Sequence, residues 1–132
     1  LSHIITNIPG VSGCYKGGIV AYDNDIKAGV LGISADTLGM FGAVSPKTAG
    51  EMAEGVCRVL MTDYGIGITG IAGPGGGTQN KPTGLVYIAL ACPGGNAIVE
   101  KHIFPWQREV NKQAAAQAAL ALLWRTLKNS HA

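Results

Sequence analysis

Apolar residues recur along the chain at two spacings, one typical of helices and one typical of strands. Helical spacing is clearest at positions 49, 52, 53, 56, 59 and 60, which fall on one helical face. The first residues repeat it at positions 1, 4, 5 and 8, before Pro9 and Gly10 end the element. Short apolar runs predict strands over 19–22, 64–69, 85–91 and 98–104. An alanine-rich segment predicts a final helix over 108–127.

Polar residues mark where the inner helices begin. Asp23, Ser34 and Ser45 can each cap a first helical turn, and Pro46 suits the first helical position. The predicted order is one helix, one strand, three helices, three strands and one helix. This order indicates an α/β fold, a three-layer α/β/α sandwich with a mixed, mainly parallel sheet. The short connection at 93–96 predicts that the last two strands pair antiparallel.

A glycine-dense loop, TGIAGPGGGT at 69–78, separates two of the predicted core strands. Glycine leaves backbone N–H groups uncovered and reaches backbone angles that are closed to other residues. Such a loop at a strand end forms an anion-binding concavity, and α/β sheets often bind ligands there. A long connection with no ligand is the alternative.

The loop matches neither of the common phosphate-binding motifs. A Walker A loop ends in Gly-Lys-Ser/Thr, which this segment lacks, and the dinucleotide fingerprint requires Gly-x-Gly-x-x-Gly opening a helix. Here Thr78 stands in the place of the last glycine, and Pro82 and a strand follow instead of a helix. We therefore expect a mononucleotide or another small anion rather than a dinucleotide.

Composition narrows the class of protein. The 132 residues make one domain, and a hydrophobic content of 47% supplies a core. Charged residues are only 14% and the net charge is +2, so no basic face for nucleic acid is indicated. No apolar run reaches the ~20 residues that a membrane helix needs. Three unpaired cysteines fit a reducing cytoplasm, and scattered histidines indicate no metal site.

One lysine is a candidate catalytic base. Lys27 lies in the first turns of the helix that follows the strand ending at Tyr22. A lysine whose pKa is lowered by burial can accept a proton, and a neighbouring phenol can relay it. A solvated surface lysine is the alternative.

Four segments together resemble one known family. GGIVAYDNDIK at 17–27 resembles its G-G-x-V-x-Y-S-N-x-x-K, and FGAVS at 41–45 resembles its H-G-A-V-S. TGIAGPGGGT at 69–78 with KPTG at 81–84 resembles T-G-I-A-G-P-x-G-G followed by K-P-x-G. FPWQR at 104–108 resembles F-P-G-D-R. These motifs are similar to the C-terminal domain of the bacterial competence/damage-inducible CinA proteins, and the resemblance covers nearly the whole chain.

The resemblance implies an amidohydrolase that deamidates nicotinamide mononucleotide to nicotinate mononucleotide and ammonia in pyridine nucleotide recycling. It implies no metal and no organic cofactor, a cytoplasmic location and a homodimer. The family's nucleophile is a serine in an upstream E-S-C-T-G-G motif, with Tyr22 and Lys27 at the positions of its catalytic partners. The implied substrate-binding residues are Thr69, Gly70, Ala72, Gly73, Pro74, Gly75, Gly76 and Arg108. A solvated helix-start residue is the alternative role for Arg108.

Two departures from the family pattern leave a second function open. Leu1 would fall just after the nucleophile motif, so we expect residues 1–132 to be a single domain without its N-terminal strand and first helix start. Trp106 and Gln107 replace the family's Gly-Asp before Arg108. The alternative is a non-catalytic module that binds a nucleotide or another domain of a competence or damage-induced protein. A weaker alternative is an oligomerisation domain that uses the alanine-rich last helix.

Overall fold

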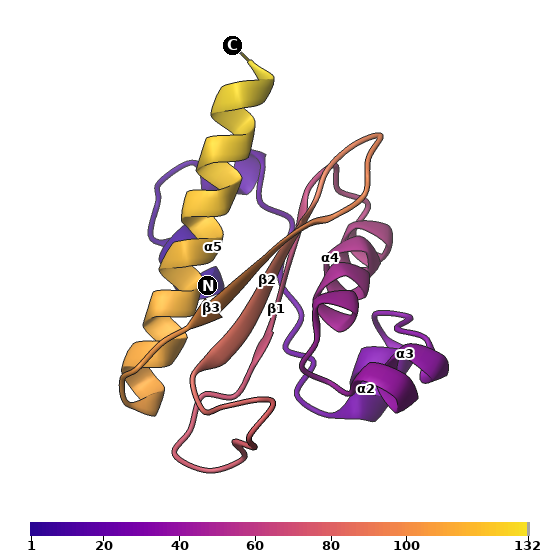
Figure 1. Cartoon of the computed structure of the whole chain (residues 1–132). Helices are drawn as coiled ribbons and strands as arrows, with labels where there is room; N and C mark the ends of the chain where they lie inside the picture. The colour runs from indigo at the N-terminus through magenta and orange to yellow at the C-terminus, as the bar shows by residue number, and fades with distance from the viewer. Residues whose placement is uncertain (132) are drawn as a thin grey trace.

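The computed structural model describes residues 1–131 of the chain (Figure 1). Two clusters of buried apolar residues form its core, one on each face of a small sheet. The elements follow in the order α1 (Ser2–Thr6), η1 (Val11–Gly13), α2 (Asn24–Gly29), α3 (Ala35–Phe41), α4 (Pro46–Leu60), β1 (Gly65–Gly70), β2 (Leu85–Ala91), β3 (Ile98–Ile103) and α5 (Arg108–Ser130).

The predicted helix caps form as expected. The Asp23 side chain accepts a hydrogen bond from the Asp25 amide at 2.8 Å and starts α2. Ser34 accepts the Thr37 amide at 3.0 Å at the start of α3. Ser45 likewise starts α4, with Pro46 in its first turn. These caps satisfy amides that a helix start otherwise leaves without a partner.

The sheet corrects the predicted strand directions. Its order is β1-β2-β3 and both pairs are antiparallel, so the expectation of a mixed, mainly parallel sheet was wrong. Parallel neighbours need a long crossover, usually a helix. The chain instead returns from β1 to β2 through residues 71–84, which include most of the glycine loop, and the Gly84 amide donates to the Ile71 carbonyl at 2.7 Å. The predicted antiparallel pairing of the last two strands is confirmed.

The strand predicted over 19–22 does not form. Residues 16–22 belong to no helix or strand, and no backbone hydrogen bond joins them to the sheet within the described chain. Val20 is 88% exposed and Tyr22 is 81% exposed. A strand is stabilised by pairing with a neighbouring strand, so an apolar run without such a neighbour does not form one.

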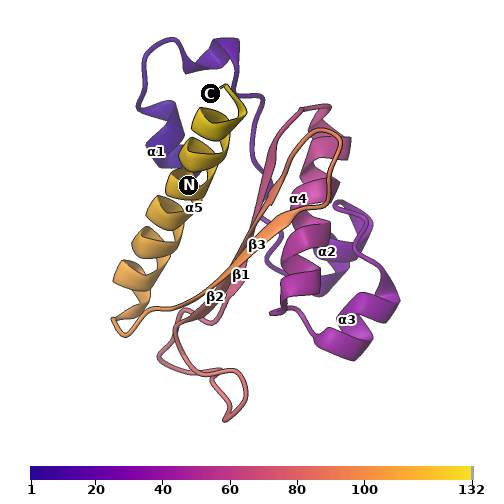
Figure 2. The ribbon, with the colours of Figure 1, turned by 45° about the horizontal axis from the view of Figure 1, so that its top comes forward.

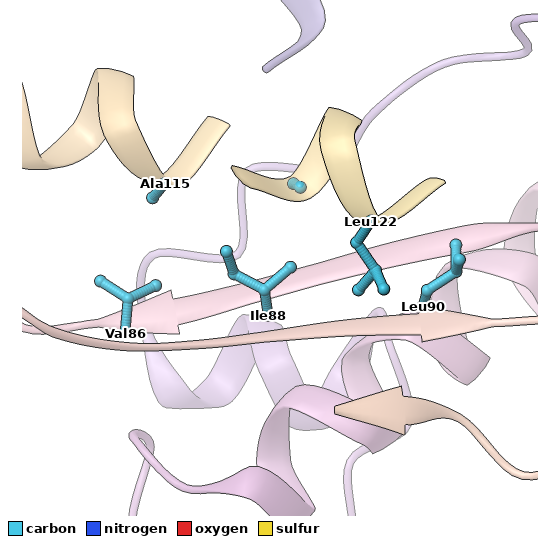
Figure 3. Close-up of a cluster of buried hydrophobic side chains, with 6 residues drawn as sticks. Val86, Ile88, Leu90, Ala115 and Leu122 are labelled. Carbon is cyan, nitrogen blue, oxygen red and sulfur yellow. The ribbon is translucent and has the colours of Figure 1, made fainter. Parts of the chain in front are cut away.

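Helix α5 packs on one face of the sheet. Val86, Ile88 and Leu90 of β2 point toward the helix that carries Ala115 and Leu122 (Figure 3), and Ala119 belongs to the same buried cluster. The alanines allow close approach of the helix to the sheet, so the alanine-rich segment packs within this domain. Among the larger apolar residues of α5, Trp124 is 67% exposed. Within residues 1–131 no helix combines the length and the apolar character that crossing a membrane requires.

Helix α4 packs on the opposite face, and α2 and α3 lie beside it (Figures 1 and 2). Ala49 and Ala53 of α4 contact Ala89 and Ala91 of β2. Gly67 of β1 makes this approach possible, because a methyl group there would overlap the Ala49 carbonyl and the Ala53 amide. The sheet is therefore covered by helices on both faces, each through small residues.

One carboxylate joins α3 to α4. Glu51 accepts the Thr37 hydroxyl at 2.5 Å and the Ser34 amide at 2.9 Å. Burial alone would raise the pKa of Glu51, but these hydrogen bonds and the nearby Lys47 ammonium outweigh it and lower the pKa below 4.5. The charged form of Glu51 therefore stabilises the native state.

Candidate functional site

A cavity of about 470 Å³ opens where β1 ends and the glycine loop begins. Its volume lies within the ~300–1,000 Å³ range of small-molecule sites. Five parts of the chain line it, namely the region 21–27, Ala43 and Val44 before α4, Met52 of α4, β1 with the glycine loop, and the first turns of α5. Residues far apart in the sequence thus meet at one end of the sheet.

The glycine loop closes on itself at its base. The Ile71 amide donates to the Leu85 carbonyl at 2.9 Å, and the Thr78 amide donates to the Lys81 carbonyl at 2.8 Å. Gly73 has a φ of +93°, and a methyl group there would lie 2.5 Å from Thr83 Cγ2. Within the described residues, no hydrogen bond uses the amides of Ala72, Gly73, Gly75 and Gly76. Those amides border the cavity and can donate to an anion.

The predicted base Lys27 is buried beside the cavity, with 7% of its surface exposed. Its Nζ donates to the Ala21 carbonyl at 2.8 Å and to the Tyr22 carbonyl at 3.3 Å. Burial lowers the pKa of the Lys27 amine below 10.5, and the carboxylate of Asp23 opposes that shift only in part. A neutral amine uses its two N–H bonds for the two carbonyls and keeps a lone pair that can accept a proton.

The predicted phenol Tyr22 also borders the cavity, but not as the sequence suggested. Lys27 contacts the backbone of Tyr22 rather than its hydroxyl. That hydroxyl instead accepts a hydrogen bond from Arg108 Nη2 at 3.4 Å, across 86 positions of sequence. Arg108 therefore lies between the phenol and the glycine loop, where its Nη1 donates to the Gly73 carbonyl at 3.0 Å.

Lys112 is a cavity residue that the sequence reasoning missed. It follows Arg108 by one helical turn on α5, and this i, i+4 spacing is the signal that could have revealed it. Neither side chain forms an ion pair in the part of the chain that the structure describes. The lining contains these two cations and Lys27 but no Asp or Glu, so the cavity favours an anionic ligand.

A buried amide fixes this end of α5 against the loop. Asn111 Nδ2 donates to the Ala72 carbonyl at 3.0 Å and to the Trp106 carbonyl at 2.9 Å, and Oδ1 accepts the Trp106 amide. The Trp106 ring, which replaces a glycine of the family pattern, stacks on Phe104 at 6.0 Å. Despite this replacement, Arg108 lies in the cavity.

The remaining predicted residues divide into two groups. Thr69, Gly70, Ala72, Gly73, Gly75 and Gly76 all line the cavity, whereas Pro74 does not. Thr69 is buried, and its hydroxyl donates to the Ala43 carbonyl at 2.6 Å. No serine or cysteine among the described residues lines the cavity. Residues 1–131 also contain no cluster of His, Cys, Asp or Glu suited to a metal ion.

Comparison with curated proteins shows close relatives along nearly the whole chain. The chain is 49% identical over 128 residues to a putative competence-damage inducible protein of Moorella thermoacetica, covering 97% of this chain and 31% of that protein. It is 49% identical over 129 residues to a CinA-like protein of Microcystis aeruginosa, with 96% and 31% covered. The chain thus spans less than a third of the length of these relatives.

Solved structures show the same fold. The competence/damage-inducible protein CihA of Agrobacterium tumefaciens superposes with a TM-score of 0.90 at 37% identity, covering 94% of this chain and 76% of that one. A competence-damaged protein (CinA) superfamily member from Escherichia coli gives a TM-score of 0.90 at 30% identity, with 95% and 72% covered. The family model described as the CinA C-terminal domain matches residues 1–127. The chain therefore belongs to the CinA C-terminal domain family.

Proposed function

We propose that this domain binds nicotinamide mononucleotide and takes part in the hydrolysis of its carboxamide. One observation carries the proposal: a buried lysine of lowered pKa, a phenol, unused loop amides and two further cations border a single cavity without a carboxylate. The overall reaction consumes one water and yields nicotinate mononucleotide and ammonia. The negative phosphate of the substrate suits the cationic lining, and hydrolysis of its carboxamide requires a base such as Lys27.

Different cavity residues would act on the carboxamide and on the phosphate of the substrate. Lys27 would accept the proton of the attacking hydroxyl and return it to the leaving amine. Tyr22 would hold the phosphate-binding Arg108 in place, because the two side chains are hydrogen-bonded. Arginine binds phosphate through two parallel N–H donors, and Lys112 adds a second charge one turn away. Amides of the glycine loop would stabilise the tetrahedral oxyanion, where one donor is typically worth ~10²–10³ in rate.

The source of the nucleophile distinguishes two candidate functions. Thr69 carries the one hydroxyl besides Tyr22 in the described lining, and that hydroxyl is committed to Ala43. In the deamidase proposal, the serine that the family resemblance implies is supplied from outside these residues. The same observation favours the second candidate, a nucleotide-binding module without catalysis.

Ammonia release from nicotinamide mononucleotide tests the two candidates. We would assay the 132-residue chain beside the longest product that its gene encodes, each with Lys27→Met and, as a control, Lys101→Met on exposed β3. Activity that requires the longer form and Lys27 supports the deamidase. Activity in the 132-residue chain itself would contradict the assignment of a nucleophile outside these residues. Binding of the nucleotide without turnover in either form would establish the module.

The homodimer and the cytoplasmic location are further parts of this proposal. The family resemblance supports both. Light scattering coupled to size-exclusion chromatography should give twice the 13.5 kDa chain mass for the 132-residue protein. Fractionation of the native cells should place the gene product with cytoplasmic markers.

A further inference from the structure

Three consecutive carbonyl oxygens beside the cavity each accept a hydrogen bond from a different side chain. Lys81 Nζ donates to the Phe41 carbonyl at 2.6 Å. The Thr48 hydroxyl donates to the Gly42 carbonyl at 2.7 Å, and the Thr69 hydroxyl donates to the Ala43 carbonyl at 2.6 Å. The three donors come from the connection between β1 and β2, from α4 and from β1, so three parts of the fold hold one short segment.

This segment forms a wall of the proposed nucleotide site. It leaves α3 at Gly42, whose φ of +77° ends the helix, and continues through Ala43 and Val44, which line the cavity. After Phe41 it belongs to no helix or strand, and within the described chain the amides of Ala43 and Val44 donate no hydrogen bond. Side-chain donors therefore provide the order that a backbone ladder provides elsewhere.

Lys81 differs from the two threonines in what it connects. Thr48 and Thr69 are buried in the regular elements that lie directly beside the segment. Lys81 lies three residues beyond the glycine loop, and its amide donates to the hydroxyl of Thr78, the last residue of that loop, at 3.0 Å. Residues 70–73, Gly75 and Gly76, which precede Lys81 in the chain, line the cavity together with Ala43 and Val44. The Lys81–Phe41 contact thus joins the connection between β1 and β2 to the end of α3, 40 positions away in sequence.

The chemistry of the contact makes it stronger than an ordinary surface hydrogen bond. Lys81 forms no ion pair with any carboxylate of the described residues, so its ammonium is free to serve the carbonyl. That carbonyl belongs to the last residue of α3, where the helix dipole favours a cation. A methyl group at Gly42 would lie 3.1 Å from Nζ, so glycine also leaves the room for the amine.

We propose that Lys81 is a positioning residue, which clamps the glycine loop to the segment 41–44 and thereby sets the separation of the two walls of the nucleotide pocket. This proposal rests on the proposed function of the cavity as a nucleotide site. A substrate held between preorganised walls does not have to order them on binding. Loss of a charged hydrogen bond of this kind should weaken nucleotide binding by about tenfold or more.

The test compares Lys81→Met, Lys81→Arg and the control Lys101→Met in the 132-residue protein. Calorimetric titration with nicotinamide mononucleotide measures the Kd, hydrogen exchange measures local opening, and thermal unfolding measures Tm. We expect Lys81→Met to weaken binding about tenfold or more and to raise exchange of the hydrogen-bonded amides of Gly42, Thr78 and Gly84 together, with Tm within a few degrees of that of Lys101→Met. Lys81→Arg, which keeps the donor and charge, should restore much of the affinity.

Two outcomes would overturn the clamp. Unchanged exchange at both walls in Lys81→Met would show that the contact does not hold them. Equal loss of affinity in the Met and Arg variants would show that the donor is not what matters. If the wild type does not bind the nucleotide, the proposed function fails. The exchange measurement still decides the clamp, because it needs no ligand.

Discussion

Arg108→Gln should separate phosphate recognition from every other property of the cavity. Arg108 is exposed, belongs to no ion pair of the described chain, and its side chain donates hydrogen bonds to the Gly73 carbonyl and the Tyr22 hydroxyl. Glutamine is a good helix former and keeps one donor, so α5 should start as before. We expect nicotinamide mononucleotide to bind more weakly to the variant, whereas nicotinamide riboside, which lacks the phosphate, binds equally to both proteins.

The size of the effect follows from the contact that is lost. A hydrogen bond to a charged group contributes ~1.5–3 kcal/mol, and ~1.4 kcal/mol corresponds to a tenfold change in Kd. The Kd of the nucleotide should therefore rise about 10- to 150-fold. Lys112 remains in the cavity, so binding should be weakened rather than abolished. Removal of one charge should also reduce the dependence of Kd on salt.

Arg125→Gln provides a matched control on the same helix. Residues 108 and 125 are 17 positions apart, so about 25 Å of α5 separates them. Arg125 pairs with Glu100 at 2.5 Å on the surface, and loss of that pair should cost at most ~1 kcal/mol of stability. The control therefore loses the same side chain and charge but should keep the nucleotide affinity.

Calorimetric titration of wild type and both variants, at low and physiological salt, measures these differences. Circular dichroism on the same samples verifies that the helices are intact. Equal nucleotide affinity in Arg108→Gln and wild type would refute the assignment of Arg108 to the phosphate. An equal loss for the riboside would refute it as well, since the contact would then involve another part of the ligand.

Three further changes test the rest of the structure. Glu51→Gln should lower the free energy of unfolding by ~1–2 kcal/mol at pH 7, where the carboxylate accepts from Thr37. Because folding lowers the pKa of Glu51, this difference should be full above pH 4.5 and vanish as the pH falls through the lowered value, as urea unfolding across pH will show. Gly67→Ala should lower the free energy of unfolding by ~1–3 kcal/mol, because the added methyl group overpacks against Ala49, and urea unfolding measures the loss. Gly75→Ala is the control, because a methyl group there meets no atom within 4 Å, whereas Gly94 has a φ of +74° that alanine would strain. Lys27→Met should abolish the proton transfer of the proposed deamidase, and ammonia release below ~1% of wild type is expected, whereas retained activity would contradict the role of the base.

Helix α5 shows why packing and binding are linked in this domain. Its middle and C-terminal half bring Ala119 and Leu122 onto the sheet, and its first turns bring Arg108 and Lys112 to the cavity. Asn111 lies between the two regions and joins the helix to the Ala72 carbonyl. The same packed helix therefore fixes the position of two charges relative to the glycine loop.

Local features of the sequence predicted most of the elements and part of the site. Helix starts at Asp23, Ser34 and Ser45 were predicted correctly, because a cap depends on groups within one turn. The glycine loop and Arg108 were predicted as a substrate site from the family resemblance, and the structure brings them to one cavity. Because these features depend on neighbouring residues or on recognisable motifs, they can be predicted from a single sequence.

Only the tertiary structure decided how these elements face one another. The direction of the strands depends on where the glycine loop returns, and the burial of Lys27 depends on neighbours outside its own helix. The Arg108 contact with Tyr22 spans 86 positions and that of Lys81 with Phe41 spans 40. Such contacts form when the chain collapses on a common core. Helix propensity and hydrophobic spacing act over a few residues and do not predict such distant contacts. The sequence therefore determined the individual helices, caps and loop, and the packing of the folded chain determined how they form the site.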